Sequence, residues 1–208
     1  QPTLQNTYLA NIFFFDTNSV NSNYAELVFP SIDTYAKIYL NDSLVYTADN
    51  AFIPHRMQVK EYLINGSNEL TVVISPPVKF HEARYKNEDY HFPAPNDVHD
   101  IAIAPYTRKP QYQFGWDWSL RLNTIGFNKP ASLEFYDENR IVNTSVNVIE
   151  VNNKVATLEL TTFFSIEKDD EYTWVSSLFG DVKVKVKNGI AKRYITIENP
   201  KLWWPAGR

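Results

Sequence analysis

Hydrophobic and polar residues alternate with a period of two along most of the chain, and helical spacing is scarce. Such alternation places every second side chain on one face of a β-strand, and runs rich in β-branched and aromatic residues between Asn, Asp, Ser and Pro are typical of strands. Asn41-Asp42 lies between two such runs and predicts a tight hairpin, although neither residue is glycine. The pattern predicts strands over Tyr8–Asp16, Ala25–Phe29, Tyr35–Leu40, Ser43–Thr47 and Glu69–Ile74.

Residues 75–111 interrupt this alternation. Six prolines and three of the four histidines lie here, and the stretch is expected to be long and irregular. A connection of that length inside a compact domain is usually functional or packed against a neighbour. It leads directly into residues 111–130, QYQFGWDWSLRLNTIGFNKP, the most distinctive segment of the chain.

We place a domain boundary at residues 137–141. Beyond it, the sequence is a simpler succession of predicted strands. The clearest run is DVKVKVK, in which Val182, Val184 and Val186 face one side and three lysines the other. We interpret the lysine row as a solvated face rather than a ligand site, and Asn188-Gly189 as the turn that follows it. The strands predicted in this part are Thr144–Val151, Val155–Phe164, Tyr172–Leu178, Val182–Val186 and Arg193–Ile197.

Length and composition agree with two domains and exclude several classes of protein. The 208 residues are divided here into domains 1–138 and 139–208, both all-β, the second an immunoglobulin-like sandwich. A net charge of −4 without a basic stripe argues against nucleic-acid binding, and no apolar run is long enough to span a membrane. The absence of cysteine excludes disulfides and leaves the compartment open, with a periplasmic or extracellular location favoured.

The segment around residues 115–118 sets Asp117 between two indoles beside a glycine. In an extended backbone, Trp116 and Trp118 would lie on one side and Asp117 on the other, so that at least one large group faces a polar surface. A carboxylate beside an aromatic plane suits a sugar ring, because it accepts hydrogen bonds from hydroxyls while the indole covers an apolar C–H face. The competing interpretation is that both indoles pack between two sheets while Asp117 caps a turn.

Three ordered motifs resemble the β-mannosidases of glycoside hydrolase family 2. RKPQYQFGWDWSLR, followed by KPASLEFYD, is similar to the family's RKxxYxFGWDWGxR and xPVxLExYD. FPSIDTYAKIYLNDSLVYTADNAF, from Phe29 to Phe52, is similar to FxGLDTYAxVYLNGxxLxxADNMF. NPKLWWPAGR, from Asn199 to Arg208, is similar to NPxLWWPNGxG. The resemblance covers residues 8–208 and is weakest between Ile141 and Ile197.

The resemblance implies a jelly-roll, galactose-binding-like sandwich truncated at its N-terminus, followed by an incomplete immunoglobulin-like sandwich. In the family, both catalytic glutamates lie on a (β/α)₈ barrel, so no catalytic residue is expected here and this part alone is expected to be inactive. Trp116 and Asp117 are implied to reach into the −1 subsite for a terminal β-mannose, with Trp118 and Arg121 holding the loop. Ser119-Leu120 replaces the family's usual Gly-Pro, which leaves the geometry of that turn open.

Two further functions stay open: an autonomous carbohydrate-binding module that uses the same aromatic face, and a structural spacer. His81, His91 and His99 share the long stretch, but their spacings match no familiar metal-ligand motif, so no metal site is predicted. No cofactor is expected, and the expected partners are a β-mannoside substrate and the catalytic barrel. The oligomeric state is not predicted.

Overall fold

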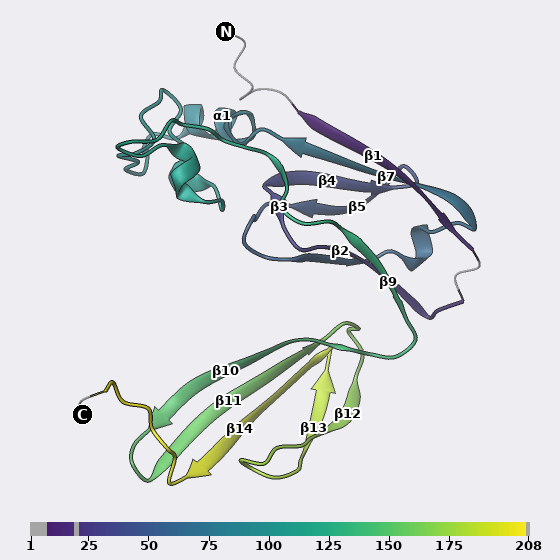
Figure 1. Cartoon of the computed structure of the whole chain (residues 1–208), viewed down its shortest axis with the longest axis vertical. Coiled ribbons are helices and arrows are strands. Elements are labelled where there is room, and N and C mark those ends of the chain that lie inside the picture. The colour runs from purple at the N-terminus through teal and green to yellow at the C-terminus, as the bar shows by residue number, and fades with distance from the viewer. Residues whose placement is uncertain (1–7, 19–20, 207–208) are drawn as a thin grey trace. The chain divides into compact units, whose positions relative to one another are not determined.

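The computed structural model describes residues 8–18 and 21–206. They divide into two compact units, the first ending at Asp137 and the second beginning at Glu138 (Figure 1). The beginning of predicted domain 1–138 and the last two residues of NPKLWWPAGR lie outside the described residues. Antiparallel strands dominate both units, and the prediction of an all-β fold is confirmed. None of the helices in residues 8–18 and 21–206 combines the length and hydrophobicity that crossing a bilayer requires.

The first unit is built from two main sheets that enclose one core. One sheet has the order β1-β7-β4-β5, with β1 at Leu9–Thr17, β7 at Gly66–Ser75, β4 at Tyr35–Leu40 and β5 at Ser43–Ala48. The other has the order β6-β2-β9, with β6 at His55–Gln58, β2 at Tyr24–Phe29 and β9 at Ser132–Tyr136. A short ladder pairs β3 (Ile32–Asp33) with β8 (Gly126–Phe127), and a 3₁₀ turn, η2, covers Lys60–Tyr62.

Alternation explains which face of each strand is buried. Along β7, residues 68, 70, 72 and 74 are buried while their neighbours are partly exposed, as a period of two requires. The predicted hairpin joins β4 to β5, and both Asn41 and Asp42 have a positive φ, which the favoured two-residue hairpin turn needs. The core between the sheets includes Leu27, Phe29, Ile38, Val72 and Ile74.

The predicted irregular stretch contains a helix that the sequence pattern did not predict. Helix α1 covers Pro77–Asn87 and begins with a proline in its first turn, a position where a missing N–H costs nothing. Two ion pairs along the helix, Arg84–Glu88 and Lys86–Glu82, both have N···O distances of 2.7 Å. Few apolar residues of α1 are buried, which is why no helical period was evident. The 3₁₀ turns η3 (Ala104–Tyr106) and η4 (Gln111–Phe114) follow it.

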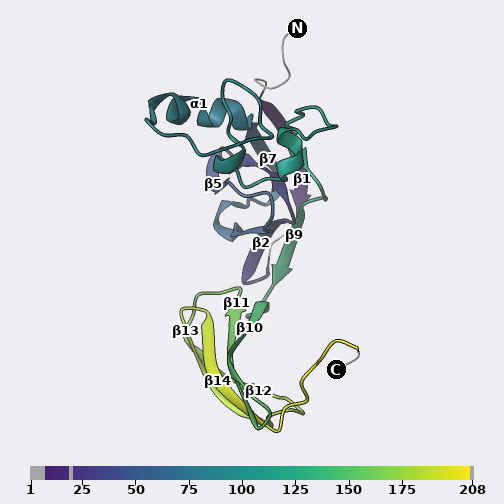
Figure 2. The same ribbon diagram turned by 90° about the vertical axis from the view of Figure 1, so that its left-hand side faces the viewer.

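The second unit is one curved five-stranded sheet with the order β10-β11-β14-β13-β12 (Figure 2). In β13 the valines at 184 and 186 are buried and the three lysines are exposed, which confirms the predicted alternation. Asn188 and Gly189 have positive φ and make the predicted turn to β14. Of the predicted immunoglobulin-like sandwich, the structure describes this one sheet within residues 138–206. The strands are β10 Ile141–Val151, β11 Val155–Phe164, β12 Asp170–Trp174, β13 Val182–Lys187 and β14 Ile190–Glu198.

Candidate functional site

The Trp116–Ser119 segment is a tight turn, not the extended strand that the sequence suggested. Trp116 N–H donates to the Ser119 carbonyl at 3.3 Å, and Ser119 N–H donates to the Trp116 carbonyl at 3.2 Å. Asp117 and Trp118 are therefore the central residues of the turn. The expectation that the two indoles share one side of a strand is wrong, because the chain reverses between them.

All three side chains of the Trp-Asp-Trp sequence are exposed. Trp116 is 48% and Trp118 82% exposed, so neither indole packs between the sheets. Asp117 is exposed as well, and within the described part of the chain no hydrogen bond or ion pair to it is found. Its carboxylate is therefore available to accept hydrogen bonds from a ligand.

Glycine is required immediately before the turn. Gly115 has φ +114°, a conformation that side-chain-bearing residues rarely adopt, and a Cβ there would lie 2.7 Å from the Asn96 carbonyl oxygen. Gly115 N–H also donates to the Tyr112 carbonyl at 3.3 Å, ending η4. The glycine thus lets the backbone leave the 3₁₀ turn in the direction of the Trp-Asp-Trp tip.

Phe114 anchors the N-terminal side of the turn in a small second core. Its side chain is 1% exposed and packs with Val78, Ile103 and Ala104. Helix α1 and η3 therefore have a role in the site, since they supply the apolar surface that receives Phe114. This burial opposes displacement of the segment as a whole.

Arg121 clamps the C-terminal side of the turn. Its Nε donates to Asp97 Oδ1 at 2.6 Å, and its terminal nitrogen donates to the Ile101 carbonyl at 3.2 Å. Asp97 is buried, and its other oxygen accepts the backbone N–H groups of Ile103 and Ala104 at 2.7 and 3.0 Å. These contacts suit the loop-holding role predicted for Arg121.

Trp118, the other residue predicted to hold the loop, is 82% exposed, and its supporting role stays a prediction. Phe114 and Asp97 give the loop buried contacts that the sequence did not predict. Nothing local distinguished Asp97, because its partner Arg121 lies 24 positions away. Ser119 closes the turn through backbone atoms, and Leu120 is 77% exposed, so the Ser-Leu departure from the family motif leaves a closed turn.

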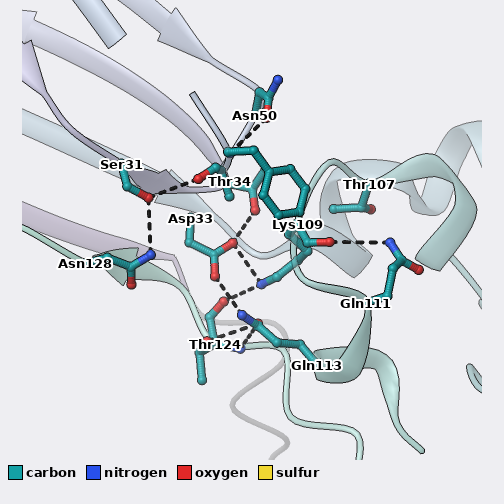
Figure 3. A network of polar contacts seen from close by, with 12 residues as sticks. Ser31, Asp33, Thr34, Asn50, Thr107, Lys109, Gln111, Gln113, Thr124 and Asn128 are labelled. Carbon is teal, nitrogen blue, oxygen red and sulfur yellow. Dashed lines mark hydrogen bonds and ion pairs between the residues drawn. The ribbon is translucent and has the colours of Figure 1, made fainter. Parts of the chain in front are cut away.

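Beneath the loop lies a network of polar side chains centred on Asp33 and Lys109 (Figure 3). Lys109 is fully buried, and its ammonium lies 3.1 Å from Asp33 Oδ1. Burial lowers the pKa of Lys109, and the charge of Asp33 opposes that shift. Both residues fall inside the resembling motifs, but the sequence did not indicate that they pair.

The histidines of the long stretch have separate partners. His81 Nε2 lies 2.6 Å from the Tyr35 hydroxyl, His91 stacks on Tyr85, and His99 Nδ1 accepts Ile101 N–H at 3.4 Å. Across residues 8–18 and 21–206, no group of three or more His, Asp or Glu side chains is placed to hold a metal ion.

A groove of about 630 Å³ opens elsewhere in the first unit and has different chemistry. Its walls are mainly apolar and include Phe13, Phe15, Phe29, Phe127 and Leu133. Sugar sites combine an aromatic plane with several convergent polar groups. The exposed Trp116–Ser119 turn offers a carboxylate beside an indole, a combination that the groove lining lacks.

Comparison with known proteins places the chain in a family. Residues 5–129 match the glycosyl hydrolase 2 galactose-binding domain-like family. The chain belongs to this family. The predicted resemblance and the galactose-binding-like fold of the first unit are thereby confirmed. The matched region includes the Trp116–Ser119 turn, Asp33 and Lys109.

The relatives include fungal and animal proteins. Beta-mannosidase B of Thermothelomyces thermophilus is 28% identical over 189 residues, which cover 87% of this chain and 22% of the relative. A probable beta-mannosidase of Caenorhabditis elegans is 25% identical, with 97% and 24% covered. The chain thus spans about a fifth of the length of the curated relatives it matches.

Solved structures of glycoside hydrolases are also similar to this chain. The crystal structure of a beta-D-mannosidase from Dictyoglomus thermophilum has 29% sequence identity and a TM-score of 0.72, covering 98% of this chain and 26% of that one. A Bifidobacterium dentium beta-glucuronidase has 17% identity and a TM-score of 0.59, with 96% and 35% covered. The second likeness concerns the fold alone.

Proposed function

We propose that this chain is the N-terminal accessory region of an exo-acting, retaining β-mannosidase, which hydrolyses terminal β-D-mannose from non-reducing ends. In this proposal a catalytic barrel outside these 208 residues supplies both catalytic carboxylates. The first unit is the jelly-roll domain and the second is the start of the immunoglobulin-like domain. Family membership and the mannosidase relatives support this assignment.

The observation that carries the proposal is the exposed Asp117 on a turn whose two sides are anchored. A carboxylate accepts hydrogen bonds from neighbouring sugar hydroxyls, and Trp116 offers an apolar wall beside it. The turn alone forms one side of a site, which favours an accessory contribution over an autonomous binding module. We assign Trp116 and Asp117 to the −1 subsite and Arg121 to the support of the turn.

Asp117→Ala tests this assignment in the full-length enzyme. We expect kcat/KM for an aryl β-mannoside to fall severely, because hydrogen bonds that strengthen in the transition state are lost. Asp181→Ala removes another exposed carboxylate, from the second unit, and should leave the rate unchanged. Activity of Asp117→Ala within about threefold of the wild type, less than ~1 kcal/mol of transition-state stabilisation, would contradict the assignment.

A further inference from the structure

We propose that the buried pair Asp33 and Lys109, acting through Gln113, sets the position of the Trp116–Ser119 turn. The three residues are then positioning residues for sugar recognition by Asp117. This inference rests on the proposed function and assigns a role to groups that do not themselves reach the sugar.

Gln113 joins both sides of the loop at its base. Its backbone carbonyl accepts Leu122 N–H at 3.0 Å, which closes residues 113–122 into a loop. Its side-chain oxygen accepts the N–H and the hydroxyl of Thr124 at 3.1 and 3.0 Å. One residue on the entering side therefore holds three groups on the leaving side.

The same side chain ties the loop to the sheet. Gln113 Nε2 donates to Asp33 Oδ2 at 3.1 Å, and Asp33 is the last residue of β3 (Figure 3). Asp33 lies 80 positions earlier in the chain and is 4% exposed. Because β3 pairs with β8, the loop takes its position from the folded core rather than from its own sequence.

Lys109 completes this base. Its ammonium lies 3.1 Å from Asp33 Oδ1 and donates to the Thr124 carbonyl at 2.6 Å. Asp33 Oδ1 also accepts the hydroxyl of Thr34. Burying an ammonium and a carboxylate is costly unless further hydrogen bonds satisfy both, as they do here. Lys109 bonds Thr124 directly and Asp33 bonds Gln113, so both charged groups hold the loop as well as each other.

A purely stabilising network would predict something different from a positioning one. If the network only stabilises the fold, weakening it lowers the unfolding midpoint and leaves the folded enzyme as active as before. If it positions the turn, the folded variant has a displaced Asp117. A displacement of about 1 Å at a reacting centre can cost about 100-fold in rate.

Gln113→Met is the variant of choice, because it removes the amide without leaving a charge buried alone, as substitution of Asp33 or Lys109 would. Asn68→Ala is the matched control. Asn68 is also fully buried, and its amide bonds Thr17 Oγ1 at 3.0 Å and the Ile64 carbonyl at 2.9 Å, neither of which touches the loop. Both variants lose buried hydrogen bonds, but only one loses them beneath the turn.

The first measurement is ¹⁹F NMR of the chain labelled with fluorotryptophan. We expect Gln113→Met to shift the Trp116 and Trp118 signals and to leave those of Trp174, Trp203 and Trp204, in the second unit, unchanged. Asn68→Ala should shift neither Trp116 nor Trp118. Unchanged Trp116 and Trp118 signals in Gln113→Met would overturn the inference.

The second measurement is kcat/KM for an aryl β-mannoside in the full-length enzyme, well below the unfolding temperature. We expect Gln113→Met to lose about tenfold or more in the wild-type background and almost nothing further in an Asp117→Ala background, because groups acting as a unit are non-additive. Equal losses in both backgrounds would overturn the positioning role. Full activity of Asp117→Ala itself would instead overturn the proposed function, and the NMR signals would still decide whether the network places the turn.

Discussion

The first unit buries charged and amide side chains beneath an exposed turn, whereas in the sheet of the second unit Lys192 pairs with Glu159 from the surface. The side chains of Lys109 and Asp33 are 0% and 6% exposed, whereas those of Lys192 and Glu159, which pair at 3.1 Å, are 53% and 13% exposed. An exposed pair gains little and can be exchanged for other residues. A buried pair needs further hydrogen-bond partners, which Gln113, Thr124 and Thr34 supply to Asp33 and Lys109.

Removing one member of each pair gives the largest contrast. Lys109→Met leaves the Asp33 carboxylate buried without its counter-ion and should lower the free energy of unfolding of the first unit by about 3–5 kcal/mol. Lys192→Met should lower the free energy of unfolding of the second unit by less than about 1 kcal/mol, because one partner is largely in solvent. Amide hydrogen exchange against urea reports each unit separately. Similar losses from both substitutions would remove the distinction between the two pairs.

Alanine at two glycines with positive φ gives the next contrast. At Gly115, with φ +114°, an added Cβ would lie 2.7 Å from a carbonyl oxygen, whereas at Gly180, in the second unit, φ is +74° and a Cβ would meet nothing within 4 Å. Positive φ should cost about 1–3 kcal/mol in either alanine variant, and Gly115, with φ +114° and ψ 164°, lies in a region adopted essentially by glycine alone. Overpacking should add about 1–3 kcal/mol in Gly115→Ala alone. Thermal unfolding measures both, and equal shifts would mean that Asn96 moves aside freely.

The smallest contrast concerns how the stability of each unit depends on pH. The two units should differ because all four histidines lie in the first unit. Burial, and secondarily the charge of Arg84, lowers the pKa of His81, while Glu88 raises it. As pH falls below about 6.5, the unfolded chain binds a proton that folded His81 resists, so the first unit loses stability until the folded pKa is reached. In His81→Gln, the unfolding midpoint of the first unit should change less with pH between about pH 7.5 and 5.5. An unchanged slope would exclude His81 as its source.

In the second unit, the carboxylates of Glu159 and Asp170 have pKa values lowered chiefly by hydrogen bonds from Lys192 and from Glu171 N–H. Their stabilisation is present above the unfolded pKa and is lost only as pH falls below about 4.5. The stability of the second unit should therefore stay constant over the pH range in which the stability of the first unit declines.

Strands were predictable because their signal is local. The alternation in β7 and β13 is set by residues two positions apart, and it shows in the sequence because one face of each strand is buried. Helix α1 escaped prediction because it buries few apolar side chains and starts at prolines that also suit loops. The Trp116–Ser119 turn was not predicted, because a Trp-Asp-Trp sequence has no strong turn signature of its own.

The sequence by itself determined the all-β class and the hairpins at Asn41-Asp42 and Asn188-Gly189, and it singled out residues 115–118 as the candidate site. Only the tertiary structure decided that Asp117 faces outward, that Trp118 is exposed, and that Asp33 meets Lys109 and Gln113. The reason is distance along the chain. Alternation and turn preferences act between near neighbours, whereas the base of the loop depends on contacts such as Asp33 with Gln113, 80 positions apart, which exist only once the sheets have packed.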